Sequence, residues 1–167
     1  FQAGISGSYY GNIIESLESQ GRVKDFDIDE EMETETWWDL GMNDSTVIVF
    51  VQRFKNEIRI IDSYENSGEG LDHYMSIIDS KPYNYSKHIA PHDIRVRELG
   101  TNKSRWETAK ELGLEFDIAP KLSVEDGIEQ VRRLLPNCWF HKKHCKKLVE
   151  ALKSYCKRWD EKNNCFK

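Results

Sequence analysis

Two aspartates, Asp39 and Asp93, each stand at the end of a stretch that has the pattern of a β-strand. Asp39 follows two tryptophans in "TWWDLG", and Asp93 follows the apolar residues of "HIAPHD". Carboxylates that lie close together raise each other's pKa unless a cation sits between them. Oxygen ligands of this kind suit Mg²⁺ or Mn²⁺, and two such ions about 4 Å apart can promote phosphodiester hydrolysis. The pair therefore suggests a metal-dependent hydrolytic site.

Each aspartate has a simpler interpretation when it is taken alone. An aspartate beside a glycine, as Asp39 is in "DLG", is typical of a turn. Asp93 can equally cap the segment that follows it. The metal-site hypothesis depends on the two residues together, each at a strand end, in an order of strands that makes them neighbours.

Three further residues are candidates to support the metal ions without contacting them: Asp44, Glu65 and His92. Asp44 has a turn role as its alternative, Glu65 a surface role, and His92 a role in packing or solvation. Four basic residues follow Asp93 and are candidates to contact a DNA backbone: Arg95, Arg97, Lys103 and Arg105. For Arg105 the alternative is the exposed face of a helix.

The elements around these residues predict an α/β fold. Three extended runs at 34–40, 45–54 and 57–64 are joined by short turn-like links, which predicts an antiparallel three-strand meander. Helices and strands then alternate, which predicts one mixed five-stranded sheet with helices on both faces. The further expected elements are helices at 6–22, 68–82, 102–113, 123–136 and 141–159 and strands at 86–94 and 114–120.

The composition is that of a globular protein, and its charge is unevenly distributed, with an acidic segment near the start and a basic segment at the end. The chain has 167 residues, a net charge of −5 and no apolar run of membrane-spanning length. Residues 24–39 hold one lysine and eight acids, whereas residues 121–167 hold twelve lysines and arginines and six acids. The basic end is interpreted either as a solvated helix face or as a surface that contacts phosphates.

Cysteines are confined to the last thirty residues, without a C-x2-C pair: Cys138, Cys145, Cys156 and Cys165. A zinc site can be drawn from Cys138, His141, His144 and Cys145. The same stretch has the pattern of an amphipathic helix, so the sequence favours reduced thiols over zinc.

Several segments together resemble the C-terminal nuclease domain of the large terminase subunit of tailed bacteriophages. These are "TWWDLGMNDSTVIVFVQ", "IRIIDSYENSGEGLDHY", "HIAPHDIRVRELGTNKSRWETAKELGLEF" and "SVEDGIEQVRRLLP". The resemblance runs in order from about Gly21 to the end of the chain. It implies a ribonuclease H-like nuclease that uses two Mg²⁺ or Mn²⁺ ions to cut concatemeric double-stranded phage DNA during packaging.

The resemblance also implies roles for residues and partners. Asp39 and Asp93 match the first two of three family acids, and the third is expected beyond Lys167, so this piece is expected to have a weak metal site. Residues 1–33 match a linker that leaves an N-terminal ATPase domain, and residues 34–167 match the nuclease domain. The implied partners are DNA, that ATPase domain, the small terminase subunit and the procapsid portal, in the host cytoplasm without a membrane.

Two alternatives stay open. One is a non-catalytic module that docks on DNA or the portal through Lys142, Lys143, Lys146 and Lys147. The other is a different nuclease with the same fold, such as a ribonuclease H or a junction resolvase.

Overall fold

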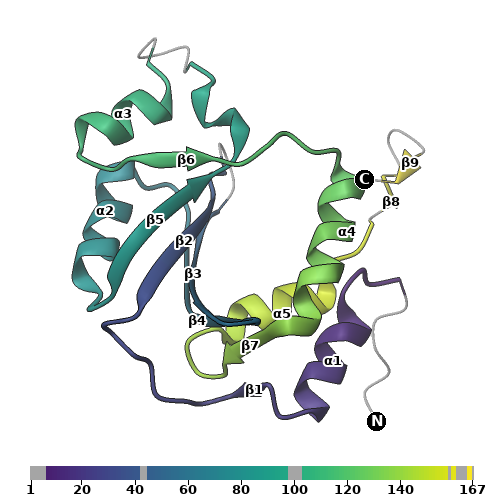
Figure 1. Ribbon diagram of the computed structural model, residues 1–167. Helices are drawn as coiled ribbons and strands as arrows, with labels where there is room; N and C mark the ends of the chain where they lie inside the picture. Colours follow the sequence, from purple (N-terminus) through teal and green to yellow (C-terminus); the bar gives the residue numbers. More distant parts are fainter. Residues whose placement is uncertain (1–6, 42–44, 98–102, 158, 161–164, 167) are drawn as a thin grey trace.

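The computed structural model describes residues 7–41, 45–97, 103–157, 159–160 and 165–166, and it has a mixed α/β architecture (Figure 1). Its centre is a seven-stranded sheet with the strand order β1-β7-β4-β3-β2-β5-β6. The antiparallel meander is confirmed as β2 (Glu33–Asp39), β3 (Thr46–Phe54) and β4 (Glu57–Asn66). On one side of it, β5 (Asn84–Ala90) runs parallel to β2, and β6 (Phe116–Ile118) runs parallel to β5.

The expectation of five strands was too low, because two short strands extend the other side of the sheet. β7 (Cys138–His141) runs parallel to β4, and β1 (Val23–Lys24) runs parallel to β7. The expected helix over 141–159 is correspondingly shorter, since α5 spans only Lys146–Ser154. Aromatic residues in "CWFH" favour an extended backbone, and Phe140 is fully buried once it joins the sheet.

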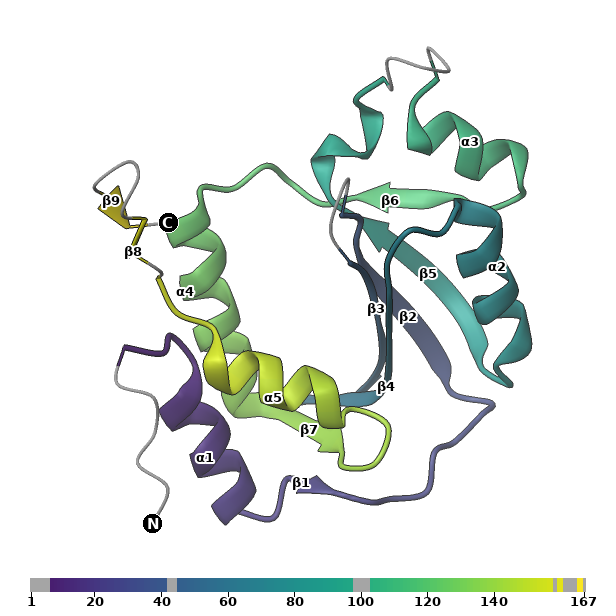
Figure 2. The ribbon, with the colours of Figure 1, turned by 180° about the vertical axis from the view of Figure 1, so that it is seen from behind.

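The meander strands send alternate side chains to opposite faces, as the two-residue period of a strand requires. Trp38, Ile48 and Phe50 belong to one core, under α2 (Leu71–Ser80) and α3 (Arg105–Glu111). The odd-numbered residues Trp37, Val49 and Val51 belong to a second core, under three other helices. These are α1 (Gly11–Ser19), α4 (Val124–Leu134) and α5. Figures 1 and 2 show the two groups of helices on opposite faces, which confirms that prediction.

Local signals at the helix ends agree with the structure. Ser123 caps α4 by accepting a hydrogen bond from the backbone of Asp126, and Ser104 forms a capping box with Glu107 at the start of α3. Gly113, at a φ of +86°, follows α3 and allows the left-handed turn that ends it. The remaining short elements are the 3₁₀ helices η1 (His92–Arg95) and η2 (Leu135–Asn137) and the antiparallel pair β8 (Trp159–Asp160) and β9 (Cys165–Phe166). No helix in the described part of the chain has the length and apolar character needed to cross a bilayer.

Candidate metal centre at the edge of the sheet

The parallel pairing of β2 with β5 brings the two predicted site aspartates together. The register ends with Trp37 opposite Ile89, so both strands finish at the same edge of the sheet. Asp39 is the last residue of β2, and Asp93 lies in η1, which begins just after β5 ends. Both side chains are exposed at this edge. The site is thus open to solvent, while the backbone of Asp39 is fixed in β2 and that of Asp93 in η1.

The electrostatic environment of Asp39 differs from that of an ordinary surface aspartate. Loss of surrounding water raises the pKa of its carboxyl, and the negative charge of Asp93 raises that pKa further. Solvent reaches part of the side chain, yet the adjacent protein still displaces enough water to disfavour the charged form. Two carboxylates held in this way are stabilised in their charged form by a cation, and oxygen donors fit Mg²⁺ or Mn²⁺.

This raised pKa has a consequence for stability without metal. A carboxyl with a higher pKa in the folded state than in the unfolded chain destabilises the fold as the pH rises above its unfolded pKa, and the full effect is reached above its folded pKa. We therefore expect Asp39→Asn to raise the melting temperature at pH 7 in EDTA, by about 1–2 °C given solvent screening. The gain should vanish as the pH falls below 3.8, the ordinary aspartate value, because the carboxyl is then protonated in both states.

Differential scanning calorimetry across this pH range tests the expectation. Asp79→Asn is the matched control, since Asp79 is an exposed aspartate in the last turn of α2, near the other end of the sheet. A melting temperature lower than that of the wild type for Asp39→Asn at pH 7 would contradict the proposed charge repulsion.

Glu65 lies at the same edge and on the same face as Asp39. Asp39 pairs with Val47, and Val47 pairs with Glu65, so the three residues form one row across β2, β3 and β4. Residues paired in this way point to the same face, and two strand spacings separate the Cα atoms of the outer two by about 10 Å. Glu65 therefore borders the aspartate pair. Among the described residues, no group of three His, Cys, Asp or Glu side chains is arranged to hold a metal ion.

The other predicted site residues lie around the start of α3 or outside the described residues. Asp44 is outside them, and His92 is exposed in η1. The guanidinium of Arg95 lies 5.6 Å from the centre of the Trp106 ring, and Arg97 is exposed. Lys103 donates hydrogen bonds of 2.8 and 2.9 Å to the carboxylate of Glu111.

Arg105 has a role that the sequence did not reveal. Its Nη1 donates hydrogen bonds to the carbonyl oxygens of Leu40, at 2.9 Å, and Gly41, at 3.2 Å. These are the two residues that follow Asp39, so Arg105 ties the start of α3 to the end of β2. Neither of the two sequence interpretations, a phosphate contact or an exposed helix face, included such a link. The partners are more than sixty residues apart, and no local pattern in the sequence points to them.

We expect Arg105→Ala to weaken Mn²⁺ binding by about tenfold or more, which is typical when a group that orients a metal ligand is lost. The two carbonyls lose their donors and the end of β2 becomes freer, so Asp39 is held less firmly. Isothermal titration with Mn²⁺ measures the effect. Lys110→Ala is the control, because Lys110 is an exposed cation on the same helix. Equal affinity in Arg105→Ala and Lys110→Ala would refute this positioning role.

Of the cysteine and histidine set considered for zinc, Cys138 and Cys145 are buried in the second core, whereas His144 is exposed. Burial raises the pKa of the Cys138 and Cys145 thiols to about 12, and the Cys145 Sγ donates to the carbonyl of Ile60 at 3.4 Å. The rings of His141 and His144 stack with their centres 4.0 Å apart. Thiols that stay protonated are poor zinc ligands, so the structure favours packing roles.

Comparisons with known proteins concern the fold. No protein-family model matches the chain, and no curated protein matches it. The large terminase of a thermophilic bacteriophage, in complex with ATP-gamma-S, is similar at a TM-score of 0.67 and 16% identity. The match covers 93% of this chain and 40% of that chain, so this chain spans less than half of the length of that terminase chain.

Two structures of nuclease domains match over most of their own length as well. The P22 large terminase nuclease domain has a TM-score of 0.60 and 18% identity, with 88% of this chain and 79% of that chain covered. The large terminase nuclease from the thermophilic phage G20c, with bound cobalt, has a TM-score of 0.63 and 11% identity, with 98% and 87% covered. The chain thus has the ribonuclease H-like fold of large terminase nuclease domains, which confirms at the level of fold the resemblance found in the sequence.

Proposed function

We propose that this chain is the nuclease part of a phage DNA-packaging terminase and that it cuts concatemeric double-stranded DNA by metal-dependent phosphodiester hydrolysis. The observation that carries the proposal is the meeting of Asp39 and Asp93 at one edge of a sheet with the terminase nuclease fold. The raised pKa of Asp39 supports it, because perturbed carboxyls in exposed positions are concentrated at functional sites.

Asp39 and Asp93 would hold one or two Mg²⁺ or Mn²⁺ ions. Such ions, when bound, lower the pKa of water and offset charge on the phosphate. Residues of the chain would position the two aspartates and leave space for the substrate. The sheet fixes the backbone of Asp39, η1 holds Asp93 just beyond β5, Arg105 holds the end of β2, and the exposed edge would admit a phosphodiester. Cobalt bound to the G20c nuclease supports the use of divalent metal.

The proposed partners follow from the same assignment. Double-stranded DNA is the substrate, and Arg95 and Arg97 are proposed to contact its backbone because both are exposed next to Asp93. An ATPase domain in the same polypeptide, a small terminase subunit and a procapsid portal are the proposed partners, in the host cytoplasm. The large terminase solved with ATP-gamma-S is more than twice as long as its match to this chain, and this supports the ATPase partner.

The test is cleavage of supercoiled plasmid in the presence of Mn²⁺, Mg²⁺ or EDTA. We expect nicked and linear products with either metal and none with EDTA. Retention of DNA without cleavage in any metal would favour the non-catalytic docking module instead.

A further inference from the structure

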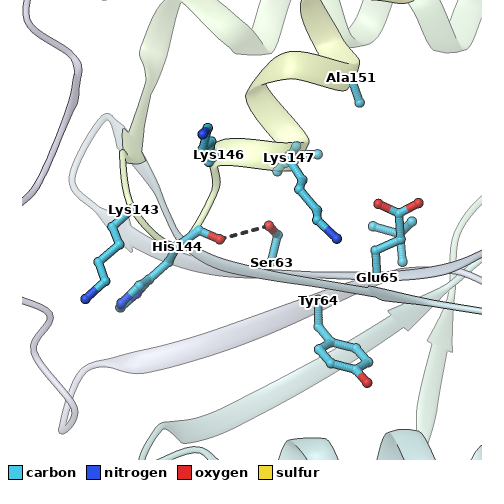
Figure 3. Close-up of a pocket in the computed structure, with 10 residues that line it drawn as sticks. Ser63, Tyr64, Glu65, Lys143, His144, Lys146, Lys147 and Ala151 are labelled. Atoms are coloured by element: carbon cyan, nitrogen blue, oxygen red, sulfur yellow. Dashed lines mark hydrogen bonds between the residues drawn. The ribbon is translucent and has the colours of Figure 1, made fainter.

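A cavity of about 320 Å³ lies beside the candidate metal centre, between β4 and α5 (Figure 3). The sheet contributes Val47, Ser63 and Glu65 to its wall. The turn before α5 and the helix itself contribute Lys143, Lys146 and Lys147. In Figure 3 the Lys147 side chain extends from α5 toward the sheet, between Ser63 and Glu65, whereas Lys143 points away from them.

The charge of this cavity is positive and not balanced by the protein. Glu65 is the one acid in its wall, against three lysines. Within the described part of the chain, no salt bridge within 4.0 Å joins any of these lysines to a carboxylate. Other lysines do have partners, since Lys153 of the same helix contacts Glu18 at 2.7 Å. Cationic side chains left without a carboxylate around a hollow suit an anionic ligand.

The cavity lies close enough to the candidate metal centre for one DNA strand to reach both. Val47 and Glu65 in its wall belong to the row that begins with Asp39, and all three point to the same face of the sheet. The row spans about 10 Å, and phosphates follow one another along a DNA strand at about 3.4 Å of axial rise. A strand that follows this row with one phosphate at the aspartates therefore brings another phosphate, within about three nucleotides, over the cavity.

We propose that Lys146 and Lys147 bind a backbone phosphate of the DNA strand being cut, within about three nucleotides of the phosphate that is hydrolysed. This inference rests on the proposed function and adds a location for the DNA. Ser63 Oγ donates to the carbonyl of His144 at 3.2 Å and so fixes the turn before α5 on the sheet. The two lysines are exposed, which leaves their ammonium groups available to a phosphate.

The experiment measures DNA binding without metal, so that it is independent of cleavage. A fluorescent duplex is titrated with the 167-residue chain in EDTA, and the logarithm of the affinity is followed against the logarithm of salt concentration. Each lost phosphate contact reduces the steepness of this relation by about 0.9. We expect a reduction of about 1 for Lys147→Gln and about 2 for Lys146→Gln combined with Lys147→Gln, equally for duplexes of different sequence.

Lys55→Gln is the matched control. It removes the same charge from an exposed lysine in the β3–β4 turn, at the end of the sheet opposite Glu65. Its salt dependence should equal that of the wild type. Circular dichroism checks that all variants are folded. Inorganic phosphate is titrated as a competitor against chloride at equal ionic strength, and any displacement of the duplex beyond that caused by chloride should be lost in the double variant.

The outcomes separate this inference from the proposed function. A wild-type salt dependence in the double variant of a protein that cuts DNA overturns the phosphate contact and leaves the nuclease assignment intact. Displacement of the duplex by inorganic phosphate that persists unchanged in the double variant overturns the contact, because the competing anion then acts at a site without Lys146 and Lys147. A reduced salt dependence in a protein that cuts DNA in neither Mn²⁺ nor Mg²⁺ overturns the nuclease assignment and leaves a DNA-backbone contact.

Discussion

Asp39→Ala and Asp93→Ala are each expected to slow metal-dependent DNA cleavage by at least about 100-fold. Loss of a residue that only orients a metal ligand costs about 10- to 100-fold, and loss of a ligand itself should cost at least the upper value. Either substitution would leave bound ions with only one carboxylate of the pair at the edge of the sheet. Plasmid nicking in Mn²⁺, followed as initial rates, measures the effect.

The double variant should be hardly slower than either single variant. Residues that act as one unit give strongly non-additive losses, because the first substitution already disables the unit. Asp79→Ala serves as the control, since it removes an exposed aspartate near the opposite end of the sheet. Wild-type cleavage by both single variants would overturn the assignment of the metal centre.

Asp62→Ala is expected to have the largest effect on stability, lowering the free energy of unfolding by about 2–4 kcal/mol. Asp62 is buried on the α2 face of β4 and accepts hydrogen bonds from Lys81 Nζ at 2.5 Å and Tyr83 Oη at 3.2 Å. Its Oδ1 also accepts from the backbone of Ser63 at 2.8 Å. The truncation leaves a partly buried ammonium and a hydroxyl without their acceptor. Thermal unfolding should show a fall in melting temperature of about 5–10 °C.

Glu57→Ala provides the matched control on the same strand. Glu57 contacts Arg59 at 3.2 Å in a pair that solvent reaches on both sides, and such pairs contribute about 0.2–1 kcal/mol. Its variant should unfold within a few degrees of the wild type. Equal melting temperatures for Asp62→Ala and the wild type would mean that the Lys81–Asp62 contact contributes nothing to the fold.

The sequence predicted most of the sheet because its central strands carry strong local patterns. The apolar, β-branched runs of β3 and β4 and the short links between them identify a meander without tertiary information. β7 was missed because it has four residues and stands directly before a helical pattern, so a continuous helix explained the same letters. Its strand character comes from pairing with Ile58–Ile60 of β4, about eighty residues earlier in the chain.

In the candidate site too, the sequence identified residues with a local pattern but not the contacts that depend on tertiary packing. Asp39 and Asp93 were identifiable as strand-end acids, and the resemblance supplied the neighbouring order of their strands. Arg105 could be read only as a basic residue near a helix start, since its bonds to Leu40 and Gly41 depend on where α3 packs. The cavity beside Glu65 depends in turn on the placement of α5 against β4.

The two tryptophans before Asp39 have a consequence for the evolution of this site. Trp38 is buried in the core under α2 and α3, while Trp37 packs against the other core, so the pair fixes which way β2 faces. Asp39 shares the side of Trp37, and inserting or deleting one residue before it would turn the carboxylate to the wrong face. A change of length within β2 would therefore remove the candidate metal centre in a single step.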